Sequence, residues 1–359
     1  MTTVFPFGPQ HPILLEPLQL KLVTEDEIVQ EVIPRLGYVH RGLEGLCTSK
    51  DFRQMVQVVE RICGICSAIH GLTYCRAIEG LMEISVPARA RYLRVIWSEL
   101  HRAHSHLLWL GILADSVGFE ALFMQIWRIR EKILDLLEYT AGNRIVISVN
   151  TIGGVRRDIT EDQASTVMKT IDQVYEMFSP LNAALLNDYA MKVRTVGKGI
   201  LSADRAYELG TVGPVLRASG IAQDIRMTGY SAYNELEFKP VTESAGDIRA
   251  RISVRYREVL QSIDLVRKAL QQLPGGEIRK KVTRKKKPQG EYVVRSEQPR
   301  GEVLYYVKAS GRKYLDRLRV RTPTFANLPA LMGFLPGMDM ADVPLAVFSL
   351  DPCIACTER

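Results

Sequence analysis

Two Cys-x-x-Cys pairs that lie almost a whole chain apart constrain this fold more than any other feature. Cys63 and Cys66 form the first pair, and Cys353 and Cys356 form the second. Four thiolates in two such pairs can hold a metal in a tetrahedral or square arrangement. Because a local zinc knuckle joins cysteines that are close in sequence, this site would need the complete fold to assemble it. We therefore expect a buried reaction centre rather than a local staple.

Structural zinc is the main alternative for the four cysteines, since zinc takes the same ligands. The wide separation of the pairs weighs against it. His70 lies about one helical turn after Cys66; it can ligate a metal, donate a hydrogen bond to a thiolate, or be a satisfied core histidine. Asp351 precedes the second pair and is expected to face the metal pocket.

The composition is globular, with 47% hydrophobic and 24% charged residues, and the formal net charge is +7. Much of this charge lies in one basic run, residues 279–287. A solvated loop is one interpretation of the run; a docking patch for an acidic partner or for anionic lipid headgroups is the other. The run has no interleaved aromatic residues and no known binding motif, so we expect no nucleic-acid partner.

No apolar run approaches the roughly 20 residues that span a bilayer, so any membrane link is expected to run through a partner. The first residues are uncharged and interrupted by Pro6, unlike a secretory signal, and we expect a cytoplasmic location. Paired thiols in such a chain favour metal or redox sites over disulfides.

The periodicity predicts an α+β fold that is mainly α. Apolar residues at helical spacing predict a helical stretch and then four long helices, enough for a bundle. Short strands are predicted near the N-terminus and again after the bundle, followed by a proline-punctuated, irregular tail. The helical ranges are 50–82, 87–110, 119–140, 160–193 and 247–273, and the later strands fall within 291–322.

We expect one domain over 1–359, made of successive parts. These are a β-rich part over 1–45, a helical core over 50–275, a basic loop over 276–290, and a β or irregular part over 291–359 that closes the metal site.

The residues around the cysteines resemble one family closely. Arg61-Ile-Cys-Gly-Ile-Cys66 and Asp351-Pro-Cys-Ile-Ala-Cys356 look like the two metal-binding motifs of NiFe-hydrogenase large subunits. Arg41-Gly-Leu-Glu44 and Pro299-Arg300-Gly301 look like two further motifs of that family. The matches run through the chain in the family's order, which implies the hydrogenase large-subunit fold with a long-helix bundle at its core.

The start of the chain points to a subtype. Phe7-Gly-Pro-Gln-His-Pro12 resembles the start of the energy-converting hydrogenases and of the homologous complex I subunit near its quinone site. That complex I subunit lacks the metal-binding cysteines, so their presence here favours a hydrogenase. The length and the ending Cys-Thr-Glu-Arg359 resemble the membrane-associated Ech type, in the form left after a peptidase removes a C-terminal extension.

The resemblance implies ligand roles. Cys63 and Cys353 match terminal nickel thiolates, and Cys66 and Cys356 match thiolates that bridge nickel to iron, which is expected to carry CO and cyanide. Soft sulfur ligands suit a nickel ion that changes oxidation state.

Two further residues match groups around those ligands. Arg300 matches an arginine near a cyanide that serves as a base or electrostatic stabiliser in H–H cleavage; its alternative role is a surface salt bridge. Thr324 matches a hydroxyl residue that donates to the other cyanide.

Two carboxylates also have matched roles. Glu16 matches a glutamate that passes protons to and from a nickel thiolate, and its alternative is an exposed strand residue. Glu44 matches a ligand of an Mg²⁺ or Fe²⁺ ion, which many relatives complete with a terminal histidine. Arg359 stands at that position and cannot ligate a metal, so we expect it to pair with Glu44.

The resemblance implies the catalytic subunit of an energy-converting NiFe-hydrogenase that reduces protons to H2 reversibly. Reduced ferredoxin would supply electrons through a small subunit with a 4Fe-4S cluster and a further iron–sulfur subunit. Integral membrane subunits would couple the reaction to ion translocation, with this chain peripheral on the cytoplasmic side of the cell membrane. The alternatives are a related membrane-bound sulfane-sulfur reductase, and a non-catalytic zinc-bearing or quinone-site scaffold subunit.

Overall fold

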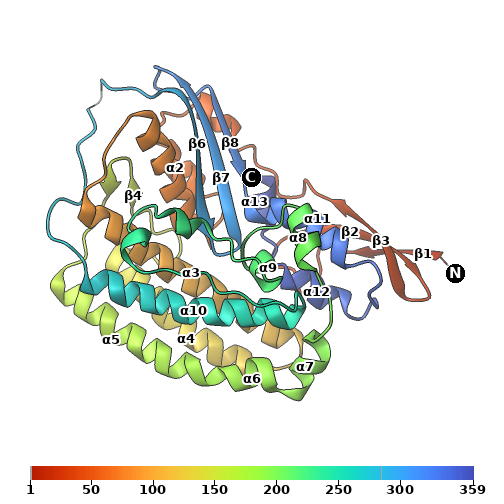
Figure 1. Cartoon of the computed structure of the whole chain (residues 1–359). Coiled ribbons are helices and arrows are strands. Elements are labelled where there is room, and N and C mark those ends of the chain that lie inside the picture. The colour runs from red at the N-terminus through yellow and green to blue at the C-terminus, as the bar shows by residue number, and fades with distance from the viewer. Residues whose placement is uncertain (1, 284) are drawn as a thin grey trace.

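A computed structural model describes residues 2–283 and 285–359 of the chain. Figure 1 shows a layer of long helices, a sheet with a helix beside it on one side of that layer, and an N-terminal sheet that projects to one side. This arrangement confirms the expected α+β class with a core of long helices.

The N-terminal sheet is antiparallel and confirms the predicted strands. Its members are β1 (Thr2–Phe7), β2 (Gln19–Glu25) and β3 (Ile28–Arg35), in that order. Leu20 and Leu22 alternate along β2 and point into the core, as one buried face of a sheet requires. Pro6 lies in the edge strand β1, where a missing N–H is tolerated.

The four long helices are α3 (Ala88–Ser116), α4 (Glu120–Ala141), α5 (Glu161–Phe178) and α10 (Ile248–Gln271). α3 packs against both α4 and α10, which explains its burial along most of its length. Two sequence signals set helix starts. Thr160 and Gln163 form a reciprocal capping box on α5, and the Asp247 side chain accepts from the N–H of Ala250 at the start of α10.

The single helix predicted over 160–193 is wrong, because the chain breaks after Phe178. A short turn, η2 (Ser179–Leu181), is followed by α6 (Asn182–Asn187) and α7 (Tyr189–Thr195). Pro180 lacks an N–H and disfavours the helical conformation of the residue before it. Asp188 then caps α7 by accepting from the N–H of Met191.

The second sheet carries the C-terminal strands. β6 (Gln289–Gln298), β7 (Gly301–Ser310) and β8 (Arg317–Arg321) are antiparallel, and β6 and β7 pack on α2 (Ser67–Leu81). Gln298 pairs with Gly301, so a two-residue turn links β6 to β7. That turn is Pro299-Arg300, which places the predicted functional arginine at the end of a rigid hairpin.

The expected irregular tail is instead helical. It forms α11 (Pro323–Phe334), α12 (Val343–Ser349) and α13 (Ile354–Glu358). Pro323 and Pro344 lie in the first turns of α11 and α12, where a missing N–H costs nothing and the fixed φ suits a helix. The prolines therefore mark helix starts rather than an irregular chain.

Several short elements complete the fold. They are η1 (Gly45–Thr48), α1 (Met55–Glu60), β4 (Asn150–Thr151), β5 (Gly154–Val155), α8 (Ala203–Glu208), α9 (Gly213–Ala218), η3 (Ile225–Thr228) and η4 (Tyr233–Glu235). None of the helices in the described part of the chain has the length and apolarity to cross a membrane.

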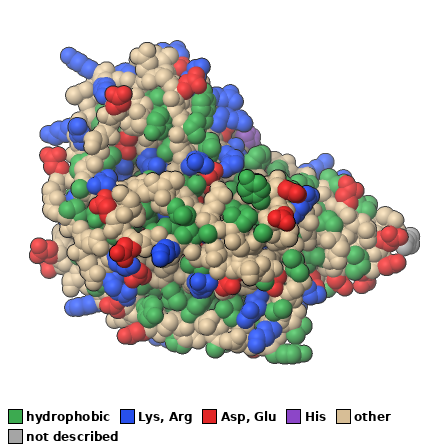
Figure 2. Space-filling view, in the orientation of Figure 1, with side chains coloured by type: hydrophobic (Ala, Val, Ile, Leu, Met, Phe, Trp, Pro, Cys, Tyr) green, Lys and Arg blue, Asp and Glu red, His purple; other side chains and the backbone are tan. Residues whose placement is uncertain are grey.

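The basic run begins as an ordered segment. Arg279 forms a β-bridge with Gly154, and residues Arg279, Lys280 and Lys281 line an open cavity of about 540 Å³ together with Arg53. Arg284 lies outside the described residues. Lys and Arg side chains project at the upper left of Figure 2, the region where Figure 1 shows the segment that follows α10.

Candidate metal centre

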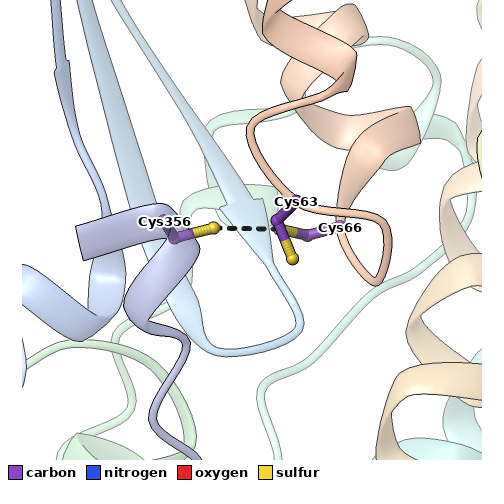
Figure 3. Close-up of side chains that lie close together, drawn as sticks. All are labelled: Cys63, Cys66 and Cys356. Atoms are coloured by element: carbon purple, nitrogen blue, oxygen red, sulfur yellow. Dashed lines mark hydrogen bonds between the residues drawn. The ribbon is translucent and has the colours of Figure 1, made fainter. Parts of the chain in front are cut away.

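The two cysteine pairs meet in the folded chain. Cys63 and Cys66 lie in the loop between α1 and α2, and Cys353 and Cys356 lie at the start of α13. Cys63 Sγ is 3.3 Å from Cys353 Sγ, and Cys66 Sγ is 3.4 Å from Cys356 Sγ. Figure 3 shows Cys356 on α13 pointing across to Cys66, with Cys63 beside them. Each residue of one pair therefore faces one residue of the other.

The donor set fits a thiolate-bound metal. Cys63, Cys66 and Cys356 have sulfur atoms within 4.8 Å of one another, and all four cysteines are buried and free of disulfides. Soft sulfur ligands in a dry pocket suit nickel, zinc or an iron–sulfur centre. A site drawn from both ends of the chain can form only in the complete fold, as the spacing of the motifs predicts.

The pKa values of the four thiols are shifted in different directions. Hydrogen bonds from the thiols of Cys353, Cys356 and Cys66 hold the pKa of Cys63 well below its ordinary value. Burial raises the pKa of Cys66 and of Cys356 well above theirs. A metal binds cysteines as thiolates, so a bound cation would displace the protons of these thiols.

Arg300 brings a fixed positive charge to the cysteines. Its Nη2 lies 2.7 Å from Asp351 Oδ1, and its Nε donates to the Asp351 carbonyl at 2.9 Å. Burial alone would lower the pKa of Arg300, but Asp351 and the neighbouring cysteine sulfurs hold it well above its ordinary value. The predicted functional arginine is therefore a buried, ionised group locked onto the residue that leads into the second pair.

Close packing explains the glycine after Arg300. A Cβ on Gly301 would lie 2.8 Å from Gly213 Cα, and Gly301 has a φ of 130° that disfavours other residues. Only a residue without a side chain allows the backbone to approach α9 so closely at this point. The glycine therefore lets the β6–β7 turn, and Arg300 with it, sit against α9.

His70 and Thr324 contact the cysteines from two sides. His70 Nε2 lies 3.4 Å from Cys356 Sγ, while its Nδ1 lies 2.7 Å from the Tyr305 hydroxyl. Burial lowers the pKa of His70 to about 4, so the ring is neutral and can donate to sulfur. Thr324 Oγ1 accepts from the N–H of Cys353 at 3.1 Å. This fixes the backbone of the second pair and leaves the Thr324 hydroxyl proton free to donate elsewhere.

Glu16 lies between the cysteines and an opening. Its Oε2 accepts from the N–H of Ala355 at 2.8 Å, next to Cys356. It also lines a cavity of about 460 Å³ formed by the loop before β2. Burial raises the pKa of Glu16, and the hydrogen bond from Ala355 opposes this. A half-buried carboxyl placed in this way can exchange a proton with either side.

Glu44 and Arg359 form the ion pair that the sequence predicts. Arg359 Nε donates to Glu44 Oε1 at 2.9 Å, and the N–H of Val320 donates to the same oxygen at 2.7 Å. Arg319 approaches the other oxygen at 3.4 Å. A carboxylate surrounded by guanidinium and N–H donors does not suit a divalent cation, so the Mg²⁺ or Fe²⁺ site of the family resemblance does not fit these residues, and Arg359 takes its place as the sequence predicts.

Sequence reasoning missed the residues that fasten α13. Glu358 accepts from the N–H groups of Gly37 and Val39, each at 2.6 Å, and Thr322 Oγ1 donates to the Cys356 carbonyl at 3.0 Å. Glu358 belongs to the ending Cys-Thr-Glu-Arg359, but only the folded chain shows that its side chain reaches the loop after β3.

Two sequence families match the chain over neighbouring parts. The family described as nickel-dependent hydrogenase matches residues 41–115, and the family described as respiratory-chain NADH dehydrogenase, 49 Kd subunit, matches residues 116–359. The chain belongs to this family of hydrogenase and NADH dehydrogenase subunits. The expected resemblance is thereby confirmed.

Several relatives of this family match over nearly the full chain. The membrane-bound hydrogenase subunit alpha of Pyrococcus furiosus is 38% identical over 99% of this chain and 87% of its own length. The carbon monoxide-induced hydrogenase of Rhodospirillum rubrum is 39% identical over 100% of this chain and 99% of its own. Among solved structures, a chain of the membrane-bound sulfane sulfur reductase, an archaeal respiratory membrane complex, superposes with a TM-score of 0.94. It is 28% identical, and the match covers 100% of this chain and 98% of that one.

Proposed function

We propose that this family member is the catalytic subunit of an energy-converting NiFe-hydrogenase, which reduces protons to H2 reversibly. The observation that carries the proposal is the meeting of Cys63 with Cys353 and of Cys66 with Cys356 at 3.3 and 3.4 Å between sulfur atoms. Two relatives named as hydrogenases match over nearly the full chain, which supports the same reading.

The four cysteines would hold a nickel–iron pair whose iron carries CO and cyanide. When bound, this group supplies a redox-active Lewis acid that can form or split H2. Arg300, held by Asp351, places a cationic N–H donor beside the sulfurs and can stabilise negative charge there without reorganising. Asp351 therefore acts on the centre through Arg300, as a positioning residue.

Glu16 is the proposed proton carrier of the centre. It contacts the backbone of the second cysteine pair on one side and a cavity on the other. Because its pKa is raised by burial, it can hold and release a proton nearer to neutral pH than an exposed carboxyl. His70 would hold Cys356 by donating to its sulfur.

Partners follow from the electrons that the reaction needs. The four paired thiols are committed to the centre, so clusters in other subunits would carry electrons from ferredoxin. We propose a small subunit with a 4Fe-4S cluster, a further iron–sulfur subunit, and membrane subunits that translocate ions. The chain would then lie at the cytoplasmic face of the membrane.

Metal analysis of the purified protein tests the proposal. Equal amounts of nickel and iron, with infrared bands of CO and cyanide, are the expected result. The Cys353→Ser protein should lose the CO and cyanide bands. The Cys75→Ser protein should keep them, because Cys75 is a buried cysteine outside the four-cysteine site. Zinc as the metal of the wild-type site would refute the catalytic role and favour the scaffold alternative.

Sulfane-sulfur reduction is the second candidate function. It is favoured by the TM-score of 0.94 against a chain of the membrane-bound sulfane sulfur reductase. An assay of the same purified complex with reduced ferredoxin, run once without polysulfide and once with it, distinguishes the two candidate functions. H2 release without polysulfide supports the hydrogenase, and sulfide formation without H2 release supports the reductase.

A further inference from the structure

A cluster of charged side chains lies buried behind the β6–β7 turn, and the proposed reaction does not use it. Its members belong to α3, α9, α10, β6 and the segment around η3. They are at most 1% exposed, apart from Asp224 at 4%. Among the described residues, this buried charge cluster holds four carboxyls and three guanidiniums: Glu99, Asp224, Glu258, Glu297, Arg102, Arg217 and Arg226.

The cluster has one more acid than base. His106 could supply the missing positive charge, but burial lowers its pKa. Its Nε2 lies 2.9 Å from Glu258 Oε2, and its Nδ1 has no hydrogen-bond partner among the described residues. These contacts fit a neutral ring that donates through Nε2. With all carboxyls ionised, these seven side chains would carry one net negative charge in the buried interior, which is costly.

The carboxyls differ in how well they are satisfied. Glu99 receives contacts from Arg102, Arg226, the Tyr233 hydroxyl at 2.6 Å and the Ser262 hydroxyl at 2.7 Å. Such a set of donors favours the ionised form.

The Asp224 and Glu258 carboxyls are also held as anions. Arg226 donates to both oxygens of Asp224, from Nε at 3.0 Å and from Nη2 at 2.8 Å. Arg217 Nε donates to Glu258 Oε1 at 2.9 Å, and Arg217 Nη2 lies 2.8 Å from the same oxygen.

Glu297 has the weakest support. Its Oε1 accepts from Arg217 Nη1 at 2.8 Å, a nitrogen that also lies 3.2 Å from Asp224. Its Oε2 accepts from the N–H of Ile225 at 3.1 Å. Glu297 thus shares one guanidinium nitrogen with a second carboxylate and has one backbone donor.

The other charged and titratable groups near Glu297 are already engaged. Glu302, its cross-strand neighbour, pairs with Arg295 and Arg321. On the α2 side, the Arg76 guanidinium lies over the Tyr230 ring and donates to the Arg295 carbonyl. The Tyr230 hydroxyl accepts from the N–H of Glu297.

We propose that the buried charge cluster is a proton-binding site and that Glu297 carries its proton. Burial, followed by the nearby Asp224 carboxylate, raises the pKa of Glu297 to about 7, while Arg226 and Arg217 hold the pKa of Asp224 below its ordinary value. The site fills and empties close to neutral pH and needs no metal, so it does not depend on the proposed reaction.

The site is connected to the metal centre through the backbone of β6, and Arg255 lies close enough to both for electrostatic interaction. Arg102 donates to the carbonyls of Glu297 and Gln298, at 2.8 and 3.0 Å, just before the turn that carries Arg300. Arg255, whose guanidinium feels the charges of both Glu258 and Asp351, lies 3.9 Å from Asp351 Oδ2. Loss of the proton therefore adds a negative charge on the strand that leads into the Pro299-Arg300 turn.

Infrared difference spectroscopy of the intact protein tests the site, since a protonated carboxyl has a C=O band that shifts in D2O and disappears on ionisation. The wild type should lose such a band with a midpoint at about pH 7. Glu297→Gln, which resembles the protonated form and should fold, removes it. Glu302→Gln, the matched buried control, keeps it.

Two cluster variants move the midpoint in opposite directions. Asp224→Asn removes the repelling carboxylate and lowers the midpoint, whereas Arg217→Gln removes the shared guanidinium and raises it. Because Glu16 and Glu60 can contribute bands of their own, the Glu297 band is defined as the difference between the wild type and Glu297→Gln. Absence of a titrating band from that difference, or an Asp224→Asn protein with an unmoved midpoint, overturns the proposal. Either result leaves the metal assignment intact, because metal content is measured separately.

Discussion

Arg359 Nε and Glu44 Oε1 lie 2.9 Å apart, and this pair joins the end of α13 to the loop before η1. The chain thus supplies a guanidinium to the Glu44 carboxylate. The helix that carries Cys353 and Cys356 is fastened at its far end by this contact and by Glu358.

Removing the Arg359 charge should loosen this attachment. We expect Arg359→Gln to lower the free energy of unfolding by about 1 kcal/mol, the upper range for a pair that is partly exposed. The Arg359 and Glu44 side chains are 13% and 19% exposed. Urea unfolding followed by circular dichroism gives the value.

Arg319→Gln is the matched control for this change. Arg319 contacts the same carboxylate at 3.4 Å but is 56% exposed, so its loss should cost less than about 0.5 kcal/mol. An equal loss in the free energy of unfolding for the two variants would mean that the Arg359–Glu44 pair stabilises the protein no more than the exposed Arg319 contact does.

Glu16→Gln should separate proton transfer from metal binding. Gln keeps an acceptor for the N–H of Ala355 but cannot carry a proton. We expect H2 production to fall by about 10²–10⁴-fold, the usual contribution of a positioned acid or base, with nickel and iron content unchanged. Loss of metal along with activity would show that Glu16 supports the fold of the centre instead.

Glu31→Gln provides the comparison for Glu16. Glu31 is an exposed residue of β3, and its substitution should leave both H2 production and metal content unaffected.

A buried ion pair beside α2 should be costly to break. Glu79 and Arg94 face each other through both carboxylate oxygens, at 2.6 and 2.9 Å, and Glu79 also accepts from the N–H of Gly153. Glu79→Gln leaves a guanidinium buried without a counter-charge, and we expect a loss of about 3–5 kcal/mol in the free energy of unfolding.

Two comparisons identify the origin of that loss. The double variant Glu79→Met with Arg94→Met should recover most of it, because the unpaired charge is gone. Glu208→Gln breaks the exposed Arg205–Glu208 pair and should cost less than about 1 kcal/mol. A double variant as unstable as Glu79→Gln would contradict the explanation.

Periodicity and capping signals predict the four long helices because these features are local. Thr160 and Asp247 stand where the caps form. The cysteine motifs likewise predict which residues meet, since the resemblance carries the geometry of a known fold. The break at Pro180 was missed because the apolar spacing continues past it.

The buried charge cluster has no signal of this kind. Its members Glu99 and Arg102 lie on α3 and Glu258 lies on α10, and charged residues of a helix are rarely buried. These three side chains are instead fully buried where α3 and α9 pack on α10. Only the packing of elements that are distant in sequence shows that these charges satisfy one another.

Glu60 should make the stability of the protein depend on pH. It is the last residue of α1 and is fully buried. Its Oε2 accepts from the Ser148 hydroxyl at 2.7 Å, while its Oε1 has no hydrogen-bond partner in the described part of the chain. Burial raises the pKa of Glu60 above its ordinary value of 4.5. The native state therefore keeps this proton at pH values where the unfolded chain has lost it.

The sign of the effect follows from that difference. As pH rises from 4.5 through the raised native pKa, the native state binds more protons than the unfolded state, so the free energy of unfolding falls. Glu60→Gln should flatten the decline in this window. Ser148→Ala, which removes the donor that stabilises the ionised form, should extend the decline to higher pH. Thermal unfolding over a pH series measures all three proteins, and a Glu60→Gln profile parallel to the wild type would assign the decline to other groups.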